Sequence, residues 1–507
     1  MPVNPYQAPR ARVAIIGAGF AGIAMAHELQ RAGFHDYEIL ERADSPGGTW
    51  RDNKYPGAAC DVPTLLYSFS FFDNPSWPDF FGTQKDIHQY IHEASRQLGI
   101  EQHIRYNTTV LSACYAEDNA QWTVTTESGD ERVYEHVIFA VGQLSEPKIP
   151  AIPGLDGFRG RQLHSARWAE DIDLTGKRVA IIGNGATVIQ LAPAVADRVQ
   201  SLSVFQRSAN WIIPKPLRPQ SRLFDLLERS KTGRKLLRAW LYVQRERRIS
   251  VMTDEKANQK LTDVSLGFFN RSIADPEVRS QLVPDYKLGC KRVLISNHYL
   301  QMFGEEHVSL VTHGVQRVEE DTIITADGAR HEADVIIFCT GFKATEFLSS
   351  VEVTGRGGVS LEEAWSDGAS AYLGTSVPGF PNMFTMLGPN TGLGFNSMIY
   401  MIESQARHIV RLLKQKQRKQ YSEIEVRQSA HDRFNTWLQP KLEHTAWAGT
   451  CNSWYKTDDG KITVNWPLPT YTYRAMTRFL PLRDYRFSSV RRTTNPQPVQ
   501  REYAHAS

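Results

Sequence analysis

The feature that most constrains the fold of this chain is a glycine-rich turn near its N-terminus. Residues 12–16 have the pattern of a buried strand, and they lead directly into G-x-G-x-x-G at Gly17, Gly19 and Gly22. The first glycine allows the tight turn, the second lets a pyrophosphate approach the backbone, and the third lets helix and strand pack closely. The N–H groups of the following helix then face the phosphates. Alone, this motif is a weak signal.

An acid at the end of the next strand strengthens the prediction. Residues 37–41 have strand character and end in Glu41. In dinucleotide folds a carboxylate about 20 residues after the glycines accepts a hydrogen bond from a ribose hydroxyl. We therefore predict a dinucleotide site here.

The motif recurs once. A second strand pattern, 178–182, runs into Gly183 and Gly185, but Val188 stands where a third glycine or an alanine is usual. Helix and strand should pack slightly more loosely there. The strand that follows ends in Arg207 rather than in an acid.

An arginine at this position changes the expected ligand. A guanidinium can clamp a 2′-phosphate with two hydrogen bonds, whereas a carboxylate would repel it. The alternative is that Arg207 is a solvated charge at the end of a loop. We interpret the first site as a flavin-type site and the second as an NADP site.

Length and charge limit the class of protein. The 507 residues predict about two to four domains. The 58 Lys and Arg against 55 Asp and Glu leave +3, which indicates neither nucleic acid nor a strongly acidic partner. No apolar run approaches the ~20 residues of a membrane helix, and residues 1–5 lack a signal-peptide pattern.

The cysteines are scattered, odd in number and without a C-x-x-C pair: Cys60, Cys114, Cys290, Cys339 and Cys451. This usage argues against a disulfide framework and against a zinc site, so no metal is expected. It fits a reducing cytoplasm.

The segment 44–61, between the first fold's second strand and the rest of the chain, is rich in turn formers and predicts a loop without helix or strand. It contains the pattern G-G-x-W-x4-Y-P-G-x3-D, from Gly47 through Trp50 and Tyr55 to Asp61. This pattern resembles one fingerprint of the Baeyer–Villiger monooxygenases, flavin enzymes that insert oxygen beside a ketone.

A second fingerprint of that family, F-x-G-x3-H-x3-W, appears at Phe158, Gly160, His164 and Trp168. It lies between the two nucleotide motifs, where the family carries it, although Ala169 replaces the usual Pro or Asp. Because the fingerprint sits at a linker, a hinge or hydrogen-bonding role for His164 is favoured over that of a general base.

The resemblance covers most of the chain. Residues 139–143 and 338–342 resemble the family's two strand-end crossovers, 289–292 its K-R motif and 452–455 its S-W-Y motif. Gly-Pro-Asn at 388–390 with the segment 391–397 is similar to members that handle open-chain aliphatic ketones.

The resemblance implies FAD and NADPH as cofactors and a ketone and O2 as substrates. In the family, NADPH reduces the flavin, oxygen adds to it, and the resulting C4a-peroxyflavin attacks the ketone. The tetrahedral adduct rearranges to an ester or lactone, and sulfides can also be oxidised. Arg292 would stabilise the anionic steps, and Asp61 would orient it. Without the family, Arg292 could be a structural ion pair and Asp61 an N-cap.

The motifs and the resemblance together assign the cofactor contacts. Those to FAD are Gly17, Gly19, Phe20, Ala21, Gly22, Glu41, Gly48, Thr49, Trp50, Asp61, Tyr67, Val110, Gln143 and Met398. Those to NADP are Gly183, Asn184, Gly185, Ala186, Thr187, Gln190, Arg207, Ser208, Lys291, Arg292 and Trp454. Tyr67, Val110, Gln143 and Met398 could each be ordinary packing residues, and a lone surface lysine at 291 would carry no meaning.

The expected fold is α/β, with two Rossmann-like domains and an inserted helical subdomain. We assign 1–145 and 343–490 to the FAD domain, 146–218 and 289–342 to the NADP domain, and 219–288 to the helical subdomain. Residues 491–507 should form a flexible tail. Within the insert, residues 223–243 show apolar residues at helical spacing with Arg and Lys between them. A solvated subdomain is favoured there over a membrane-surface helix.

Two other functions stay open. Flavin-containing monooxygenases that oxidise nitrogen and sulfur share the glycine motifs, but they lack the Tyr-Pro-Gly…Asp loop and the K-R arginine, both of which are present here. A protein that only senses nucleotides would bind FAD and NADP without consuming NADPH. The patterns are compatible with a monomer or a dimer.

Overall fold

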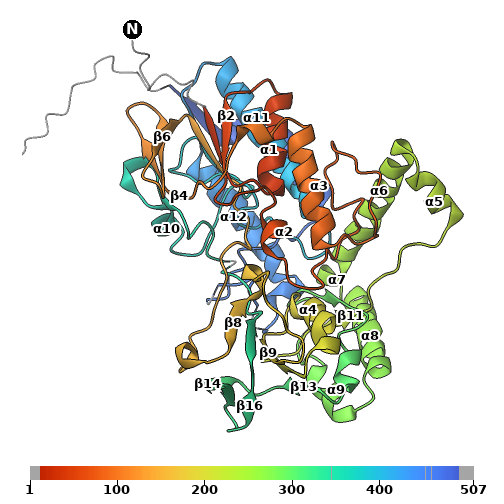
Figure 1. Cartoon of the computed structure of the whole chain (residues 1–507). Helices are drawn as coiled ribbons and strands as arrows, with labels where there is room; N and C mark the ends of the chain where they lie inside the picture. Colours follow the sequence, from red (N-terminus) through yellow and green to blue (C-terminus); the bar gives the residue numbers. More distant parts are fainter. Residues whose placement is uncertain (1–11, 344, 452, 458, 490–507) are drawn as a thin grey trace, which may run out of the picture.

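Two parallel five-stranded sheets form the frame of the protein (Figure 1). The computed structural model describes residues 12–343, 345–451, 453–457 and 459–489. The central strands, Val13–Ile16 and Arg178–Ile182, are largely buried and rich in β-branched residues, as expected for parallel sheets covered by helices. The fold is α/β with an inserted helical region, as predicted.

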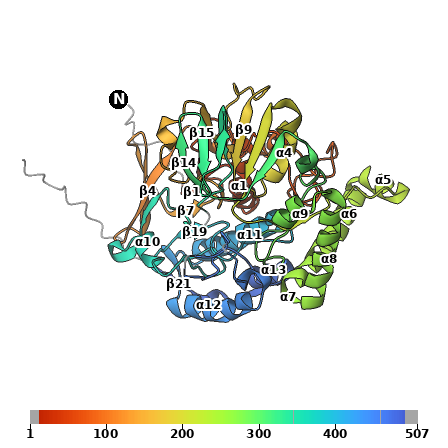
Figure 2. The ribbon, with the colours of Figure 1, turned by 90° about the horizontal axis from the view of Figure 1, so that it is seen from below.

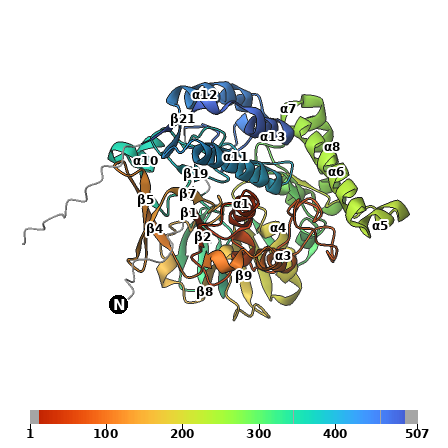
Figure 3. The same ribbon diagram turned by 90° about the horizontal axis from the view of Figure 1, so that it is seen from above.

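The first sheet has the strand order β19-β7-β1-β2-β3. Its strands are β1 (Val13–Ile16), β2 (Tyr37–Leu40), β3 (Ile104–Arg105), β7 (His136–Phe139) and β19 (Met383–Thr385). Helix α1 (Phe20–Arg31) leaves the glycine turn and packs against α11 (Met398–Arg418), beside which it lies in Figure 3. Helix α11 therefore covers this sheet together with α1.

The second sheet has the order β13-β10-β9-β17-β8. Its strands are β8 (Arg161–His164), β9 (Arg178–Ile182), β10 (Ser201–Phe205), β13 (Val308–Val311) and β17 (Val335–Phe338). Helix α4 (Val188–Val195) follows its glycine turn. Val188 is fully buried there, so the missing third glycine is accommodated within a closed apolar core.

Smaller sheets extend this frame. An antiparallel meander, β4 (Val110–Ala116), β5 (Gln121–Thr126) and β6 (Glu131–Tyr134), is joined by β18 (Glu352–Thr354), and a second meander consists of β14 (Val315–Glu319), β15 (Thr322–Thr325) and β16 (Arg330–Glu332). Two-stranded pairs join β11 (Ile212–Ile213) to β12 (Leu294–Ile295) and β20 (Glu423–Val426) to β21 (Tyr485–Ser488). The remaining helices outside the insert are α2 (Thr49–Asp52), α3 (Gln84–Gln97), α10 (Leu361–Ala364), α12 (Gln428–Glu443) and α13 (Thr470–Phe479).

The inserted region lies along one edge of the molecule in Figures 2 and 3. It consists of α5 (Arg222–Glu228), α6 (Lys231–Glu246), α7 (Ser250–Thr253), α8 (Glu255–Ser272) and α9 (Pro276–Leu282). The periodic segment 223–243 is thus two helices. Ser230 divides them because its side chain accepts a hydrogen bond from the N–H of Gly233 and caps α6.

The segment 44–61 also differs from its prediction as a loop, because α2 forms one helical turn within it. Gly47 and Gly48, with φ of +137° and +53°, reverse the chain immediately before the helix. The N–H of Asp52 then donates to the carbonyl of Gly48 at 3.1 Å and closes the turn.

Each sheet combines two separate segments of the chain. Strands β8 and β17 pair in the second sheet, and strands β7 and β19 pair in the first. The exact domain boundaries stay predictions. The tail 491–507 and Asn452 of the S-W-Y motif lie outside the described residues. Among the residues that are described, no helix has the length and apolar character needed to cross a membrane.

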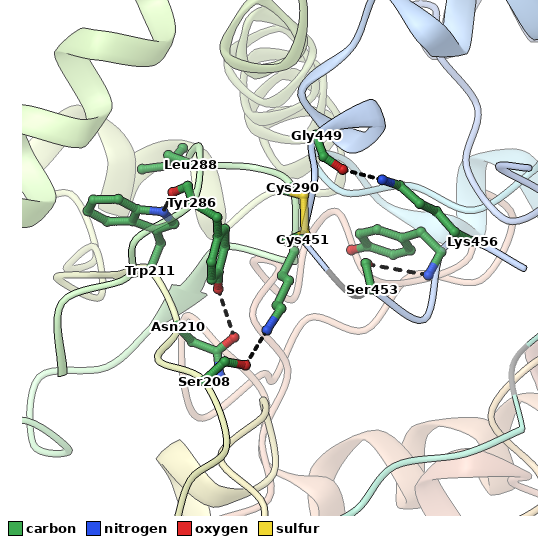
Figure 4. The surroundings of a disulfide bond; sticks show 12 residues. Ser208, Asn210, Trp211, Tyr286, Leu288, Cys290, Gly449, Cys451, Ser453 and Lys456 are labelled. Atoms are coloured by element: carbon green, nitrogen blue, oxygen red, sulfur yellow. Dashed lines mark hydrogen bonds between the residues drawn. A yellow bond between two sulfur atoms is a disulfide. The ribbon is translucent and has the colours of Figure 1, made fainter. Parts of the chain in front are cut away.

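The expectation about cysteines is wrong at one pair. Cys290 and Cys451, 161 positions apart, form a disulfide with their Cα atoms 6.2 Å apart (Figure 4). Spacing could not reveal this bond, because the two residues meet only after the loop before β12 folds against the loop after α12. Cys60, Cys114 and Cys339 are free. The bond lies next to Lys291 and Arg292, so it fixes the segment that carries both predicted cations.

We expect Cys451→Ser to lower the free energy of unfolding by about 2–5 kcal/mol, because the cross-link restricts a long loop in the unfolded chain. Denaturant titration without reductant measures this loss. Exposed Cys114→Ser should have no such effect, and with dithiothreitol present the two variants should unfold alike. Five free thiols in the denatured, unreduced protein, instead of three, would contradict the bond.

Candidate functional site

The first glycine turn is closed so tightly that side chains are excluded. Gly17 has φ +103°, and a Cβ atom on it would lie 2.9 Å from the carbonyl oxygen of Ala140. A Cβ atom on Gly22 would lie 2.0 Å from the carbonyl oxygen of Gly17. Gly19 passes Gly48 with only ordinary van der Waals room for a Cβ atom. These close approaches leave the backbone N–H groups at the start of α1 accessible to a ligand.

Glu41 stands at the carboxyl end of β2, beside this turn, and is 4% exposed. Its Oε2 accepts from the N–H of Ala18 at 2.7 Å, and its Oε1 accepts from Nη1 of Arg51 at 2.8 Å. The buried Arg51 was not among the predicted site residues. An arginine inside a turn-rich loop gives no sequence signal that distinguishes it from a solvated one.

A cavity of about 390 Å³ runs from this turn toward the second sheet. All predicted FAD contacts except Gly22 and Asp61 line it: Gly17, Gly19, Phe20, Ala21, Glu41, Gly48, Thr49, Trp50, Tyr67, Val110, Gln143 and Met398. Gly22 lies behind the turn, where it makes helix–strand packing possible. Arg292 and Trp454, predicted as NADP contacts, also line the cavity.

Hydrogen bonds and ring contacts fix the middle of the cavity. Nε1 of Trp50 donates to the hydroxyl of Tyr67 at 3.1 Å, and the ring of Phe20 meets Tyr67 edge-on at 5.3 Å between centroids. Nε2 of Gln143 donates to the carbonyl of Leu387 at 2.9 Å. Met398 begins α11 at the opposite wall.

The far end of the cavity holds an ion pair between Arg292 and Asp61. Nε of Arg292 donates to Oδ2 of Asp61 at 3.1 Å, and Nη2 donates to the same oxygen. Burial alone would raise the pKa of Asp61, but the guanidinium outweighs it and holds that pKa below its usual value. In return, the carboxylate raises the pKa of Arg292. Both groups are therefore charged at neutral pH.

A second cation supports this pair from the inserted helices. Nη2 of Arg245, near the end of α6, donates to the backbone carbonyl of Asp61 at 3.0 Å. Arg245 is 8% exposed, and its burial lowers its pKa to about 10. The loop that presents Asp61 is thus fastened from both sides.

Two further polar side chains at this end were not predicted. Asn465 is 1% exposed and lines the cavity, yet neither its amide nitrogen nor its oxygen has a hydrogen-bond partner among the described residues. The hydroxyl of Tyr455, beside Trp454, is likewise buried on the cavity wall and has no partner in the part of the chain that the structure describes. Because unpaired buried polar groups cost free energy, such groups on a cavity wall point to a ligand.

The second glycine turn repeats the first. Gly183 has φ +117°, and a Cβ atom on it would lie 2.4 Å from the carbonyl oxygen of Cys339. Gly185, Ala186 and Thr187 follow at the start of α4 and are half-buried or exposed. Nδ2 of Asn184 donates to the carbonyl of Ser208 at 2.7 Å, which ties the turn to the end of β10.

Gln190, predicted as an NADP contact, also makes hydrogen bonds within the protein. Its Oε1 accepts from the hydroxyl of Tyr55 at 3.1 Å, and its Nε2 donates to the carbonyl of Ala59 at 2.9 Å. The side chain on α4 thereby joins the second glycine turn to the Tyr-Pro-Gly loop.

Cationic groups gather beyond β10. Arg207 is exposed, and Nζ of Lys291 donates to Oγ of Ser208 at 2.5 Å (Figure 4 labels Ser208). Burial and the charge of Arg207 lower the pKa of Lys291. Two neighbouring cations that repel each other favour an anionic ligand between them.

The residues of the second fingerprint, F-x-G-x3-H-x3-W, contact other parts of the protein and not the cavity. Phe158 is buried, and a Cβ atom on Gly160 would lie 2.3 Å from the carbonyl oxygen of Asp334. His164 is 3% exposed, accepts from the N–H of Ala166 at 3.1 Å and does not line the cavity. Trp168 packs against the core of the second sheet. These positions agree with a linking role and give His164 no access to the cavity.

Comparison with known proteins identifies the family. Residues 10–361 match the model of the flavin-binding monooxygenase-like family. The chain is 40% identical to a Baeyer–Villiger monooxygenase of Streptomyces coelicolor, over 96% of this chain and 94% of that protein. It is 38% identical to one of Pseudomonas aeruginosa, over 94% and 91%.

Solved structures agree with this match. The OTEMO complex with FAD and NADP superposes with a TM-score of 0.86 at 27% identity, covering 95% of this chain and all of that one. Cyclohexanone monooxygenase from Rhodococcus sp. Phi1 bound to NADP+ gives 0.85 at 28%, with the same coverage. The chain therefore belongs to the flavin-binding monooxygenase-like family and, within it, to the Baeyer–Villiger monooxygenases.

Proposed function

We propose that this FAD- and NADPH-dependent oxidoreductase converts ketones to esters or lactones with O2, and that aliphatic ketones are its preferred substrates. The observation that carries the proposal is the Arg292–Asp61 ion pair at the end of a cavity that begins at a dinucleotide turn. Bound FAD, reduced by NADPH, supplies the activated oxygen that is inserted beside the carbonyl.

The residues present fit a flavin dinucleotide. The turn at Gly17 and Gly19 would hold the pyrophosphate, and Glu41 lies where a ribose hydroxyl needs an acceptor. At the other end, the unpaired carboxamide of Asn465 offers one donor and one acceptor side by side. The imide edge of an isoalloxazine ring carries the complementary pattern, so we assign Asn465 to that edge.

Arg292 would act on the reacting oxygens. Its guanidinium stays charged throughout, lies on the cavity wall and is held in place by Asp61. It can therefore keep an anionic oxygen nucleophile unprotonated and stabilise the oxyanion formed when a carbonyl is attacked. Asp61, which does not line the cavity, is a positioning residue.

The choice of nicotinamide cofactor would depend on Arg207 and Lys291. Both lie beyond β10, where the 2′-phosphate of NADPH is bound in such folds, and Ser208 connects them. Trp454, which is 41% exposed at the cavity, would contact the nicotinamide or the substrate.

The ketone reaction is favoured over oxidation of amines because the Asp61–Arg292 pair can stabilise an anionic oxygen. Oxidation of an amine, which is itself a neutral nucleophile, does not need that stabilisation. Sulfide oxidation could accompany the main reaction, because it needs the same reduced flavin and oxygen. A role in nucleotide sensing alone would leave the half-buried ion pair at the cavity without a function.

We expect Arg292→Ala to reduce ester formation at least about 100-fold, the loss typical of one removed oxyanion donor. Anaerobic reduction of the flavin by NADPH should continue, because it precedes the anionic steps. Gas chromatography of ketone products and stopped-flow absorbance measure the two reactions. Exposed Arg159→Ala is the matched control. Ester formation by Arg292→Ala at the normal rate would refute the assignment.

Arg207→Ala should raise the Kd for NADPH about tenfold or more, because a charge-assisted contact to the 2′-phosphate is lost. The Kd for NADH should not change, since it lacks that phosphate. Arg198→Ala, beyond the far end of α4, provides the comparison. An equal loss for both nucleotides would place the 2′-phosphate elsewhere.

Asn465→Leu tests the flavin contact without relying on turnover. Removing an amide that has no protein partner should leave the apoprotein as stable or more stable, whereas FAD should bind about tenfold more weakly with a shifted visible spectrum. Calorimetry and absorbance measure these changes. Asn435→Leu, on α12 and away from the cavity, should alter neither. An unchanged spectrum and Kd would assign the amide to another ligand.

A further inference from the structure

Helices α5 and α6 carry apolar residues on two opposite sides. One set, Phe224, Leu237 and Leu241, is buried and packs into the core of the first sheet and its helices. This inner set is sufficient to fasten the helices to the body. The other set faces solvent, where it contributes nothing to folding.

The outer set follows helical spacing. On α6 it consists of Leu236, Trp240 and Val243, at i, i+4 and i+7, and on α5 of Leu223 and Leu226. Leu223 and Leu226 are 64% and 63% exposed, Leu236 is 58% and Trp240 is 46%. Scattered exposed leucines are ordinary, but a periodic row that includes a tryptophan on a projecting helix pair marks a contact surface.

The charges around this row have one sign. The charged residues of the exposed class within 217–248 are all cations: Arg222, Arg229, Lys231, Lys235 and Arg247. The acids of this segment are either paired within it or buried. Asp225 and Glu228 pair with Arg218, and Glu246 is buried. Net charge for the whole chain is only +3, so this edge concentrates positive charge.

We propose that the outer face of α5 and α6 docks this protein on an anionic lipid bilayer. An apolar row containing tryptophan and flanked by Lys and Arg is the pattern of helices that lie in the plane of a membrane interface. Each cation near an anionic surface adds to the attraction. A second copy of this chain is disfavoured as the occupant, because a two-fold contact would bring the same cations together.

The same helix leads to the reaction site. At the inner end of α6, Arg245 holds the backbone of Asp61, and Oε2 of Glu246 accepts from the N–H of Thr470 at 2.9 Å. A protein docked through α6 would thus hold the Asp61 loop near the bilayer. Apolar ketones partition into bilayers, so this placement suits the proposed function, although vesicle binding itself does not depend on it.

Cosedimentation of the holoenzyme with vesicles tests the proposal. The protein should bind vesicles containing phosphatidylglycerol, bind phosphatidylcholine vesicles much more weakly, and dissociate as NaCl is raised. Replacing Lys231 and Lys235 together by Gln should weaken binding about 30-fold. Leu236→Glu with Trp240→Glu should abolish it.

Exposed Leu111→Glu, on β4, is the matched control and should bind like the unchanged protein. Retained FAD absorbance verifies that each variant is folded. Absence of binding to anionic vesicles, or binding that survives the 236/240 change, would overturn the proposal. Gel filtration gives a further outcome that would overturn it: a dimer that the 236/240 change dissociates would mean that a second copy covers this face.

Discussion

The structure depends on one ion pair that three distant parts of the chain must assemble. Asp61 and Arg292 are separated by 231 positions and meet at the end of the cavity. A half-buried guanidinium beside a single carboxylate keeps its full charge while its direction is fixed. The Tyr-Pro-Gly loop supplies the carboxylate and the segment before β12 supplies the guanidinium. Helix α6 holds the carbonyl of Asp61 through Arg245. If any of these segments moved, both groups would stay charged, but the guanidinium would no longer point in the required direction.

Around this pair, individual contacts connect the Tyr-Pro-Gly loop to helix α4 of the second sheet, and the segment before β12 to the loop after α12. Gln190 on α4 binds Tyr55 and Ala59, and the disulfide joins Cys290 to the segment that leads to Trp454. These polar contacts and the disulfide fix the positions of the Tyr-Pro-Gly loop and of the segment that carries Arg292.

Local patterns made both glycine turns, Glu41 and Arg207 predictable, because each depends on spacing within one βαβ unit. The family fingerprint added Asp61 and Arg292, which spacing alone could not bring together. What escaped prediction depends on tertiary contact. Arg51 becomes part of the site only by reaching Glu41, Asn465 only by lining the cavity, and Cys290 only by meeting Cys451. The break between α5 and α6 had a local cause, the Ser230 cap, that apolar periodicity conceals.

Arg245 shows how the insert and the site are connected. Helix α6 has an outer apolar row, an inner apolar row and, at its last turn, a buried arginine whose pKa falls to about 10 because burial withdraws water from it. Burying a cation beside Arg292 and Arg248 is unfavourable unless its hydrogen bond to Asp61 compensates. The hydrogen bond from Arg245 to the carbonyl of Asp61 couples the position of α6 to the Asp61 loop, so the insert contributes to the site as well as to packing.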